Sequence, residues 1–299
     1  MRRKLVQQGA STMMISLPAK WIQEHGLKKG FEISIEPVRA GLLISAGDRV
    51  EKRKTEITLT HLAESSIRTR ITTTYRKGYD QIKVNFDNEN QFKILDEVMG
   101  TRLIGFEIVE KKDKYCLVEN ITEPSEDQFD IILKKVFQNI TSLFNATRER
   151  MGGSKHVSFS DVRDIERRVQ RYDNFCRRVI SKRKFKGKNT ELFWAFLTLI
   201  VHAQREIYHM NKALGKKVSD KSLDYLGDVE KMYNLVVDTY ENRRKEGIGE
   251  IHDLEKKIVY KKGHDLVKKM GSENVLIYHL MSSARQFYQA NSPLFGLII

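Results

Sequence analysis

The most regular pattern in the chain is the spacing of apolar residues in its C-terminal half. From about position 126 onward they recur three and four positions apart, the period of amphipathic helices. The first such series contains Phe129, Ile132, Leu133, Val136, Phe137, Ile140, Leu143 and Phe144. A second helix is expected after the candidate N-cap Ser160, between turns at 151–154 and 186–189. Long helices joined by short turns predict a bundle, with two groups of three helices (126–215 and 219–299) divided near Gly215.

Residues 55–122 follow a different pattern, with short apolar or alternating runs between two helical stretches. The strands are expected at 56–59, 82–86, 104–109 and 115–118, and the helices at 62–77 and 88–102. The order β-α-β-α-β-β predicts a small α/β domain behind a charged connector at 48–54. Its glycines lack the spacing of a phosphate-binding loop. We therefore assign this segment a connecting or dimerising role.

The first 47 residues predict four short strands around one short helix. The strands are expected at 2–7, 13–17, 32–37 and 42–45, and the helix begins near Pro18 and ends before Gly26. A segment this small buries little apolar surface by itself. We therefore expect a second copy of the chain to complete it, by interleaving of strands.

The net charge of the chain predicts a class of binding partner. The 299 residues carry a formal net charge of +14 at pH 7, so a polyanion is expected to bind: nucleic acid first, an anionic membrane surface second. No apolar run approaches the length needed to cross a bilayer, and the first residues do not resemble a signal peptide. Cys116 and Cys176 form no CxxC pair, which indicates buried thiols in a reducing cytoplasm.

The basic N-terminus is the expected nucleic-acid contact. Residues 1–30 contain six Lys or Arg residues and a single acid, Glu24. Cations bind phosphates, and neighbouring amides and hydroxyls contact phosphates and base edges. The candidate DNA-binding residues are Arg2, Arg3, Lys4, Gln7, Gln8, Ser11, Thr12 and Lys20. The alternative is a basic face that only interacts with solvent.

This N-terminal pattern resembles the AbrB/MazE/SpoVT family of swapped-hairpin DNA-binding domains. The residues that carry the resemblance are the strand–Gly9–strand entry, Ile15-Ser16-Leu17-Pro18 before the helix, the turn Gly26-Leu27-Lys28-Lys29-Gly30 and the closing hairpin. The resemblance implies a swapped-hairpin β-barrel over residues 1–48, built by two chains and bound to double-stranded DNA.

The whole chain resembles the archaeal PhoU-like phosphate uptake regulators, in which helical triplets follow such a DNA-binding domain. In the central segment, 75–82 (YRKGYDQI) and 103–109 (LIGFEIV) are similar to that family's sequences, and over 126–299 the resemblance rests on helix order. It implies a homodimeric regulator of transcription or signalling linked to phosphate uptake. A phosphate-transport or signalling protein is then a further candidate partner.

A divalent metal ion is a candidate cofactor. PhoU-type bundles carry acidic E/DxxxD motifs that hold metals; here Glu166 stands for the first acid, and Asp173 is the next acid along that face. Independently of the family, His202, Glu206 and His209 are spaced four and three apart on one helix face, and Glu-x-x-His is a spacing that di-metal bundles use. The alternative is a row of polar residues beside an apolar seam.

The second predicted bundle helix is strongly basic. Between positions 161 and 188 there are eleven Arg and Lys residues and four acids. An outer face of this kind fits a DNA backbone or anionic lipid. It equally fits a face that only keeps the protein soluble, and an acidic surface of a partner protein is a further candidate ligand.

No catalytic pattern accompanies these features. The chain has no GxSxG or HExxH motif, and no cysteine with an evident basic partner. We therefore do not expect the protein to be an enzyme.

The sequence favours an α+β multidomain DNA-binding regulator whose helical half senses a signal or docks on a partner. The competing hypotheses are a PhoU-like protein that docks on a transporter, kinase or membrane surface, with the N-terminal segment as a dimeriser only, and a metal-dependent helix bundle.

Overall fold

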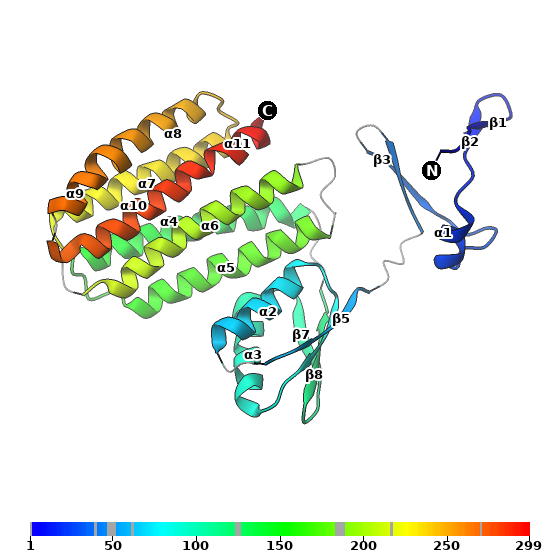
Figure 1. The fold of residues 1–299 in the computed structure, drawn as a ribbon, viewed down its shortest axis with the longest axis horizontal. Helices are drawn as coiled ribbons and strands as arrows, with labels where there is room; N and C mark the ends of the chain where they lie inside the picture. The colour runs from blue at the N-terminus through cyan, green and yellow to red at the C-terminus, as the bar shows by residue number, and fades with distance from the viewer. Residues whose placement is uncertain are drawn as a thin grey trace. The chain divides into compact units, whose positions relative to one another are not determined.

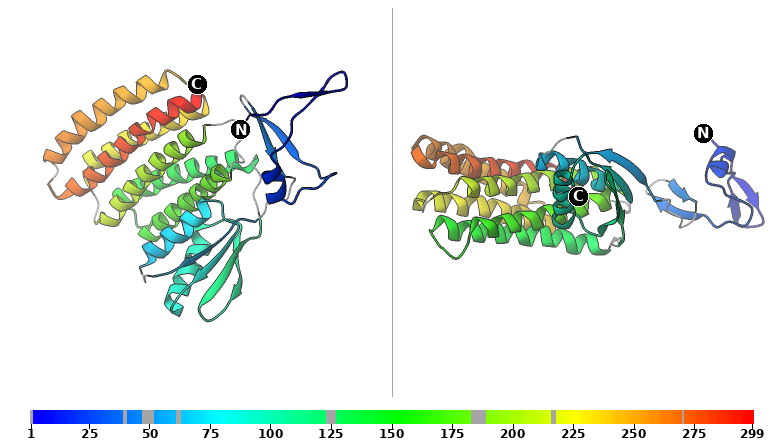
Figure 2. Two further views of the ribbon diagram at one scale, coloured as in Figure 1. Left: turned by 45° about the vertical axis from the view of Figure 1, so that its right-hand side comes forward. Right: turned by 90° about the horizontal axis from the view of Figure 1, so that it is seen from below.

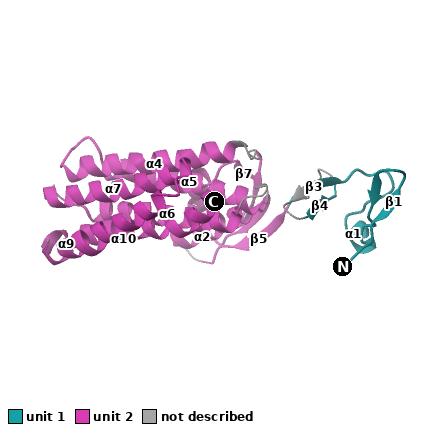
Figure 3. Ribbon diagram, turned by 90° about the horizontal axis from the view of Figure 1, so that it is seen from above, with its two compact units in different colours: residues 1–52 teal, residues 53–299 magenta. Residues whose placement is uncertain are grey.

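A computed structural model describes residues 2–38, 41–46, 52–60, 63–122, 127–182, 189–215, 218–269 and 271–299. The protein is α+β, and the chain divides into two compact units, residues 1–52 and 53–299 (Figure 3). Parts of four expectations lie outside the described residues: the connector at 48–51, the helix start at Leu62, the break at Pro124 and the turn at 186–188.

The N-terminal unit consists of two hairpins and one short helix (Figure 1). Strand β1 (Val6–Gln8) pairs antiparallel with β2 (Thr12–Met14), and β3 (Ser34–Val38) pairs antiparallel with β4 (Gly41–Ser45). Between them in sequence, α1 (Ala19–Glu24) follows Pro18 and ends at Gly26, whose φ of 60° favours glycine, as the sequence predicts. The hairpins are separate two-stranded sheets, so the described strands of one chain do not form the barrel that the resemblance implies.

The second unit begins with the expected β-α-β-α-β-β order. Its elements are β5 (Lys54–Thr58), α2 (Glu64–Arg76), β6 (Gln81–Asn85), α3 (Glu89–Arg102), β7 (Phe106–Lys111) and β8 (Tyr115–Asn120). They form one sheet in the order β5-β6-β8-β7, in which only β5 and β6 are parallel. Alternation along β6 and β8 buries Ile82, Val84, Cys116 and Val118 against α2 and α3. We call this part the α/β layer.

The rest of the second unit is helical, and its long helices lie alongside one another (Figure 2). They are α4 (Asp127–Met151), α5 (Phe159–Ser181), α6 (Thr190–Ala213), α7 (Asp220–Glu241), α8 (Gly247–Glu255), the π-helix η1 (Lys256–Gly263), α9 (His264–Lys269), the 3₁₀ turn η2 (Gly271–Glu273), α10 (Asn274–Gln289) and α11 (Asn291–Ile298). One hydrophobic core runs from Phe129 to Ile298. The two expected groups of three helices therefore share a core, with α6 packed closely on α10.

The start of α5 corrects one local expectation. Ser158, and not Ser160, is the N-cap: its hydroxyl accepts a hydrogen bond from the backbone N–H of Asp161 (3.2 Å). The Asp161 carboxylate in turn accepts from the backbone N–H of Ser158 (2.7 Å). This reciprocal capping box satisfies two backbone donors at once, which the Ser160 start does not do.

The π-helix was not expected from the sequence. The buried hydroxyl of Tyr225 on α7 donates to the carbonyl of Ile258 (2.9 Å). A Cβ atom at Gly263 would lie 2.5 Å from that hydroxyl, so only glycine leaves the room it needs. A side chain inserted against a helix in this way is a known cause of local widening.

Candidate nucleic-acid interface

The N-terminal unit exposes all eight residues predicted to contact DNA. Arg2, Arg3 and Lys4 precede β1, which contains Gln7 and Gln8. Ser11 and Thr12 follow the turn at Gly9, and Lys20 lies on α1, where it is 88% exposed and 3.8 Å from Glu24. The β1–β2 hairpin thus carries polar groups close to a run of cations. A two-stranded β-ribbon of this kind fits the major groove of DNA.

The same unit exposes much of its apolar surface. None of the residues between positions 2 and 46 whose burial the structure describes is buried. Of the sixteen large hydrophobic side chains that are exposed among the described residues, half lie in this unit: Leu5, Val6, Met13, Met14, Ile15, Phe31, Ile35 and Leu42. Apolar surface gathered in so short a segment is typical of an interface that a partner covers.

In the second unit, the structure corrects the expectation that α5 presents a basic outer face. Positions 173–180 of α5 are buried without a break, because α2 and α3 pack on one side of the helix and α4 and α6 on others. A helix buried all round is a core element. Arg167, Arg171, Arg178 and Lys182 of the basic stretch join the α/β layer to the bundle, whereas Arg163 and Arg168 are exposed. Positions 183, 184, 186 and 188 of the basic stretch lie outside the described residues.

Arg178 is the centre of this junction. Its guanidinium donates to the carboxylate of Asp80 (2.6 Å) and to the backbone carbonyls of Tyr75 (3.1 Å) and Tyr79 (2.7 Å). Lys182 also donates to the Asp80 carboxylate. Burial acts to raise the pKa of Asp80, but the hydrogen bonds from Lys182 and from the backbone N–H of Arg53 outweigh it, and the pKa is lowered. Asp80 is therefore held as a carboxylate.

Two more arginines of α5 reach the α/β layer. Arg167 donates to the carboxylate of Glu97 on α3 (2.5 Å), and Arg171 donates to the carbonyl of Leu103 (3.2 Å). Sequence reasoning missed this junction. The available signal was a pair of arginines, 177 and 178, within an apolar stretch and four or five positions after an acid.

The five candidate metal ligands are not brought together. Glu166 accepts from Arg102 (3.0 Å), and Asp173 forms ion pairs with two arginines. On α6, His202 and His209 are exposed, while Glu206 pairs with His279 of α10 (2.8 Å). Among the described residues, no group of three or more His, Cys, Asp or Glu side chains is placed to hold a metal ion.

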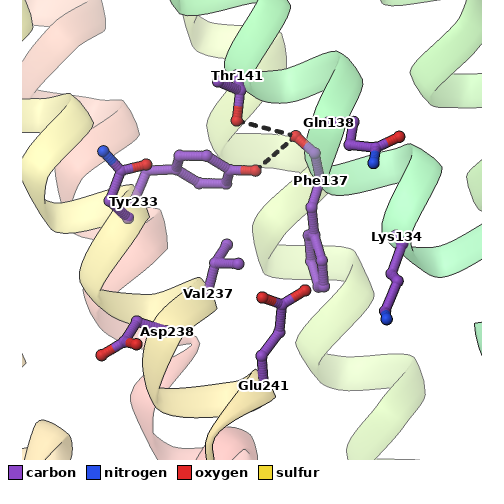
Figure 4. A pocket seen from close by; sticks show the side chains of 9 residues that line it. Lys134, Phe137, Gln138, Thr141, Tyr233, Val237, Asp238 and Glu241 are labelled. Carbon is purple, nitrogen blue, oxygen red and sulfur yellow. Dashed lines mark hydrogen bonds between the residues drawn. The ribbon is translucent and has the colours of Figure 1, made fainter.

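A hollow of about 420 Å³ lies between α4 and α7 (Figure 4). Phe137 and Val237 form apolar parts of its lining, with Lys134 on α4 and Glu241 on α7. The hydroxyls of Tyr233 (2.7 Å) and Thr141 (3.3 Å) both donate to the Phe137 carbonyl. These hydroxyl protons are therefore already engaged, and the hollow offers no evident chemistry.

Both predicted buried thiols are confirmed. Cys116 and Cys176 are free and buried, and burial raises the pKa of each thiol, that of Cys116 to about 12. A thiol with a raised pKa stays protonated and is a poor nucleophile.

Within the described part of the chain, no helix combines the length and apolar character needed to cross a membrane. Comparison with known proteins gives no match: no family model fits the chain, and no curated protein or solved structure is significantly similar to it. Its function has to be argued from its own residues.

Proposed function

We propose that the chain is a homodimeric, DNA-binding regulator of transcription, with DNA contacts from the N-terminal unit. The observation that carries the proposal is that one small unit exposes both its cations and its apolar side chains. The helical part of the second unit is its sensing or docking part. A role in phosphate uptake or signalling is suggested by the resemblance to PhoU-like regulators alone.

The apolar side chains support association with a second copy. In the β1–β2 hairpin, Val6 pairs with Met14 on one face and Gln7 pairs with Met13 on the other, so both faces carry apolar groups. Covering one large apolar side chain contributes about 1.5–3 kcal/mol. A twin chain offers the same surface and so gives a self-complementary interface.

The cations support DNA as the ligand. Arg2, Arg3 and Lys4 are exposed, and residues 1–30 contain a single acid, so each cation is available to a phosphate. The competing docking function depended on a basic outer face of α5, and several of those cations now have partners inside the second unit. DNA binding through the N-terminal unit is therefore the better supported function.

The test compares two double variants of the full chain that each remove two positive charges. Arg2→Ala with Arg3→Ala should weaken DNA binding and flatten its salt dependence, by roughly 0.9 in the slope of log K against log salt for each phosphate that is no longer neutralised. Lys268→Ala with Lys269→Ala, exposed lysines of α9, should change the slope little. Binding is measured by fluorescence anisotropy on duplex DNA from 50 to roughly 200 mM salt.

Equal salt slopes in the two double variants would remove the N-terminal arginines from the interface. If only the α9 variant lost affinity, the polyanion would bind the second unit, and the N-terminal unit would act in association only.

A further inference from the structure

The junction of α2, α5 and α6 holds more positive charge than its acids balance. The charges of Arg177 and Arg205 both act on the guanidinium of Arg76 there, and the carboxylate of Asp173 pairs with Arg76 and Arg177. We call Arg76, Arg177, Arg205, Gln170 and His202, around Asp173, the arginine cluster. All of these residues belong to the second unit.

Asp173 is fully engaged by two of the arginines. Arg177 donates through Nε to both carboxylate oxygens (2.8 and 3.0 Å), and Arg76 donates through Nη2 (3.2 Å). Arg76 also donates to the side chain of Asn174 (2.7 Å). A guanidinium has five N–H donors, so each of these two arginines has donors beyond those used here.

Arg177 also fixes the register between α5 and α6. Its Nη1 donates to the hydroxyl of Thr198 (2.9 Å), and its guanidinium lies 4.8 Å from the centre of the Trp194 ring. Consecutive packed helices joined by a short connection run antiparallel. Moving back along α5 from Arg177 to Asp173 and Gln170 therefore corresponds to moving forward along α6.

Moving forward along α6, His202 lies four residues after Thr198, and Arg205 lies three residues after His202. Residues at these spacings lie on one helix face. His202 thus comes level with Asp173, and Arg205 comes level with Gln170. The electrostatics agree with this placement. Although its side chain is exposed, partial desolvation by neighbouring atoms lowers the pKa of His202, and the charges of Arg205 and Arg177 lower it further, whereas Asp173 raises it.

Two members of the cluster, Arg205 and Gln170, have donors without an acceptor. Arg205 is half-buried and makes no hydrogen bond or ion pair with any other described residue. The amide nitrogen of Gln170 is buried and also has no hydrogen-bond partner. The well-buried Arg178 and Arg102 of this unit, in contrast, each have a carboxylate within 3.0 Å. A buried donor or cation without a partner is unfavourable.

We propose that the arginine cluster binds an oxyanion of the phosphate class, with Arg205 and Gln170 as its principal donors and Arg76 and Arg177 supplying further positive charge. Three guanidinium groups and one carboxylate leave two positive charges, which match the two negative charges of hydrogen phosphate. Planar guanidinium groups donate in a fork that suits a phosphate, and hydrogen bonds between charged groups are the strongest of their kind. The anion is inorganic phosphate or a phosphate group of a larger molecule, DNA included. This site is independent of the N-terminal DNA contacts.

The chain provides its own reporter for this site. It has two tryptophans, and in the Trp21→Phe variant only Trp194, stacked on Arg177, remains. Titrating full-length Trp21→Phe protein with potassium phosphate should change the Trp194 fluorescence in a saturable way and raise the melting temperature. Potassium chloride at matched ionic strength should do neither.

The decisive comparison is Arg205→Gln against Arg285→Gln, both in the Trp21→Phe background. Arg285 is exposed on α10, so the two variants lose the same charge. Arg205→Gln should weaken phosphate binding by roughly tenfold or more, as expected for a lost hydrogen bond between charged groups. Arg285→Gln should bind phosphate as its parent does. Without phosphate, Arg205→Gln should melt no lower than its parent, since it removes a charge that has no partner.

Further arms of the experiment distinguish the sources of the anion. If free phosphate does not bind but duplex DNA binds more weakly to Arg205→Gln than to Arg285→Gln, the phosphate belongs to DNA. If neither ligand distinguishes the two variants, the proposal is wrong. Arg2→Ala with Arg3→Ala should leave the binding of inorganic phosphate unchanged, so a failure of the N-terminal DNA interface can be told apart from a failure of this site.

Discussion

The two units of the chain differ in how far each can fold alone. The second unit has two continuous cores, one beneath the sheet and one along the whole helical bundle. The N-terminal unit has no buried side chain among those described. A chain of about 50 residues buries a smaller share of its surface than a large domain does, so little burial is left to offset its conformational entropy. The comparison supports the proposed association of the first unit with a second copy, whereas the second unit forms its cores within one chain.

The units also use their cations in opposite ways. In residues 1–30, six basic residues accompany one acid, and the described ones are exposed. In α5 several cations contact carboxylates and carbonyls of the α/β layer, as Arg178 does with Asp80 and Arg167 with Glu97. Whether a basic stretch binds a partner or holds a domain together therefore depends on the presence of acids at matching positions elsewhere in the chain.

The largest expected effect is the loss of Asp80 from the second unit. Asp80→Ala leaves Arg178 and Lys182 without their shared carboxylate in a buried junction. Removing one partner of a buried ion pair costs about 3–5 kcal/mol in the free energy of unfolding. Urea unfolding followed by the far-ultraviolet dichroism of the helices measures it. Asp265→Ala, which removes an exposed acid of α9, should cost less than about 0.5 kcal/mol.

The Asp80 interaction also predicts a pH dependence. Because hydrogen bonds and neighbouring cations hold the pKa of Asp80 below its ordinary value despite burial, its carboxylate stabilises the fold above the unfolded-state pKa, about 3.9. That contribution should disappear as the pH falls through the lowered pKa. Unfolding of wild type and Asp80→Ala should therefore converge in acid, and a difference that stays constant with pH would contradict the assigned ion pair.

A smaller effect is expected for a substitution in the N-terminal unit, on the association of two chains. Met13→Asp places a charge on a side chain that is 61% exposed in the single chain. If a twin chain covers Met13, the dimer should dissociate about tenfold to a hundredfold more readily, the equivalent of about 1.5–3 kcal/mol for one large apolar side chain. Sedimentation at several protein concentrations measures this.

Ile131→Asp is the matched control for Met13→Asp, because Ile131 on α4 is 56% exposed in the second unit. It should leave the dimer intact. Equal sedimentation of the two variants and wild type would show that the apolar surface at Met13 stays uncovered.

The smallest expected effect concerns the N-cap of α5 in the second unit. Ser158→Ala removes the N-cap of α5 and should cost about 1 kcal/mol in the free energy of unfolding. Ser160→Ala should cost much less, because Ser160 lies within the first turn and its hydroxyl accepts a hydrogen bond from the exposed Arg163. Differential unfolding of these two variants distinguishes the observed helix start from the expected one.

Sequence patterns were most informative where one segment supplies all the information. The alternation in β6, the helical period of α4 and the glycine at the end of α1 are local, and each predicted element is present within a few residues. The start of α5 was predicted two residues late because Ser158 and Ser160 are both acceptable caps, and the choice depends on the partner Asp161. The exposure of the eight N-terminal polar residues agrees with their predicted role, which stays a prediction.

By itself, then, the sequence determined the type and order of most elements, though not the π-helix η1, because hydrophobic period and turn residues act over a few positions. Only the tertiary structure decided what each charge does. Asp80 and Arg178 are 98 residues apart and share an ion pair, while the charge of Arg205 acts on Arg76 and Arg205 has no ion pair with a described residue. Such pairings follow from which helices pack together, and the hydrophobic effect that packs them is not directional. The same physics made a basic helix part of the core and left a donor-rich cluster open to an anion.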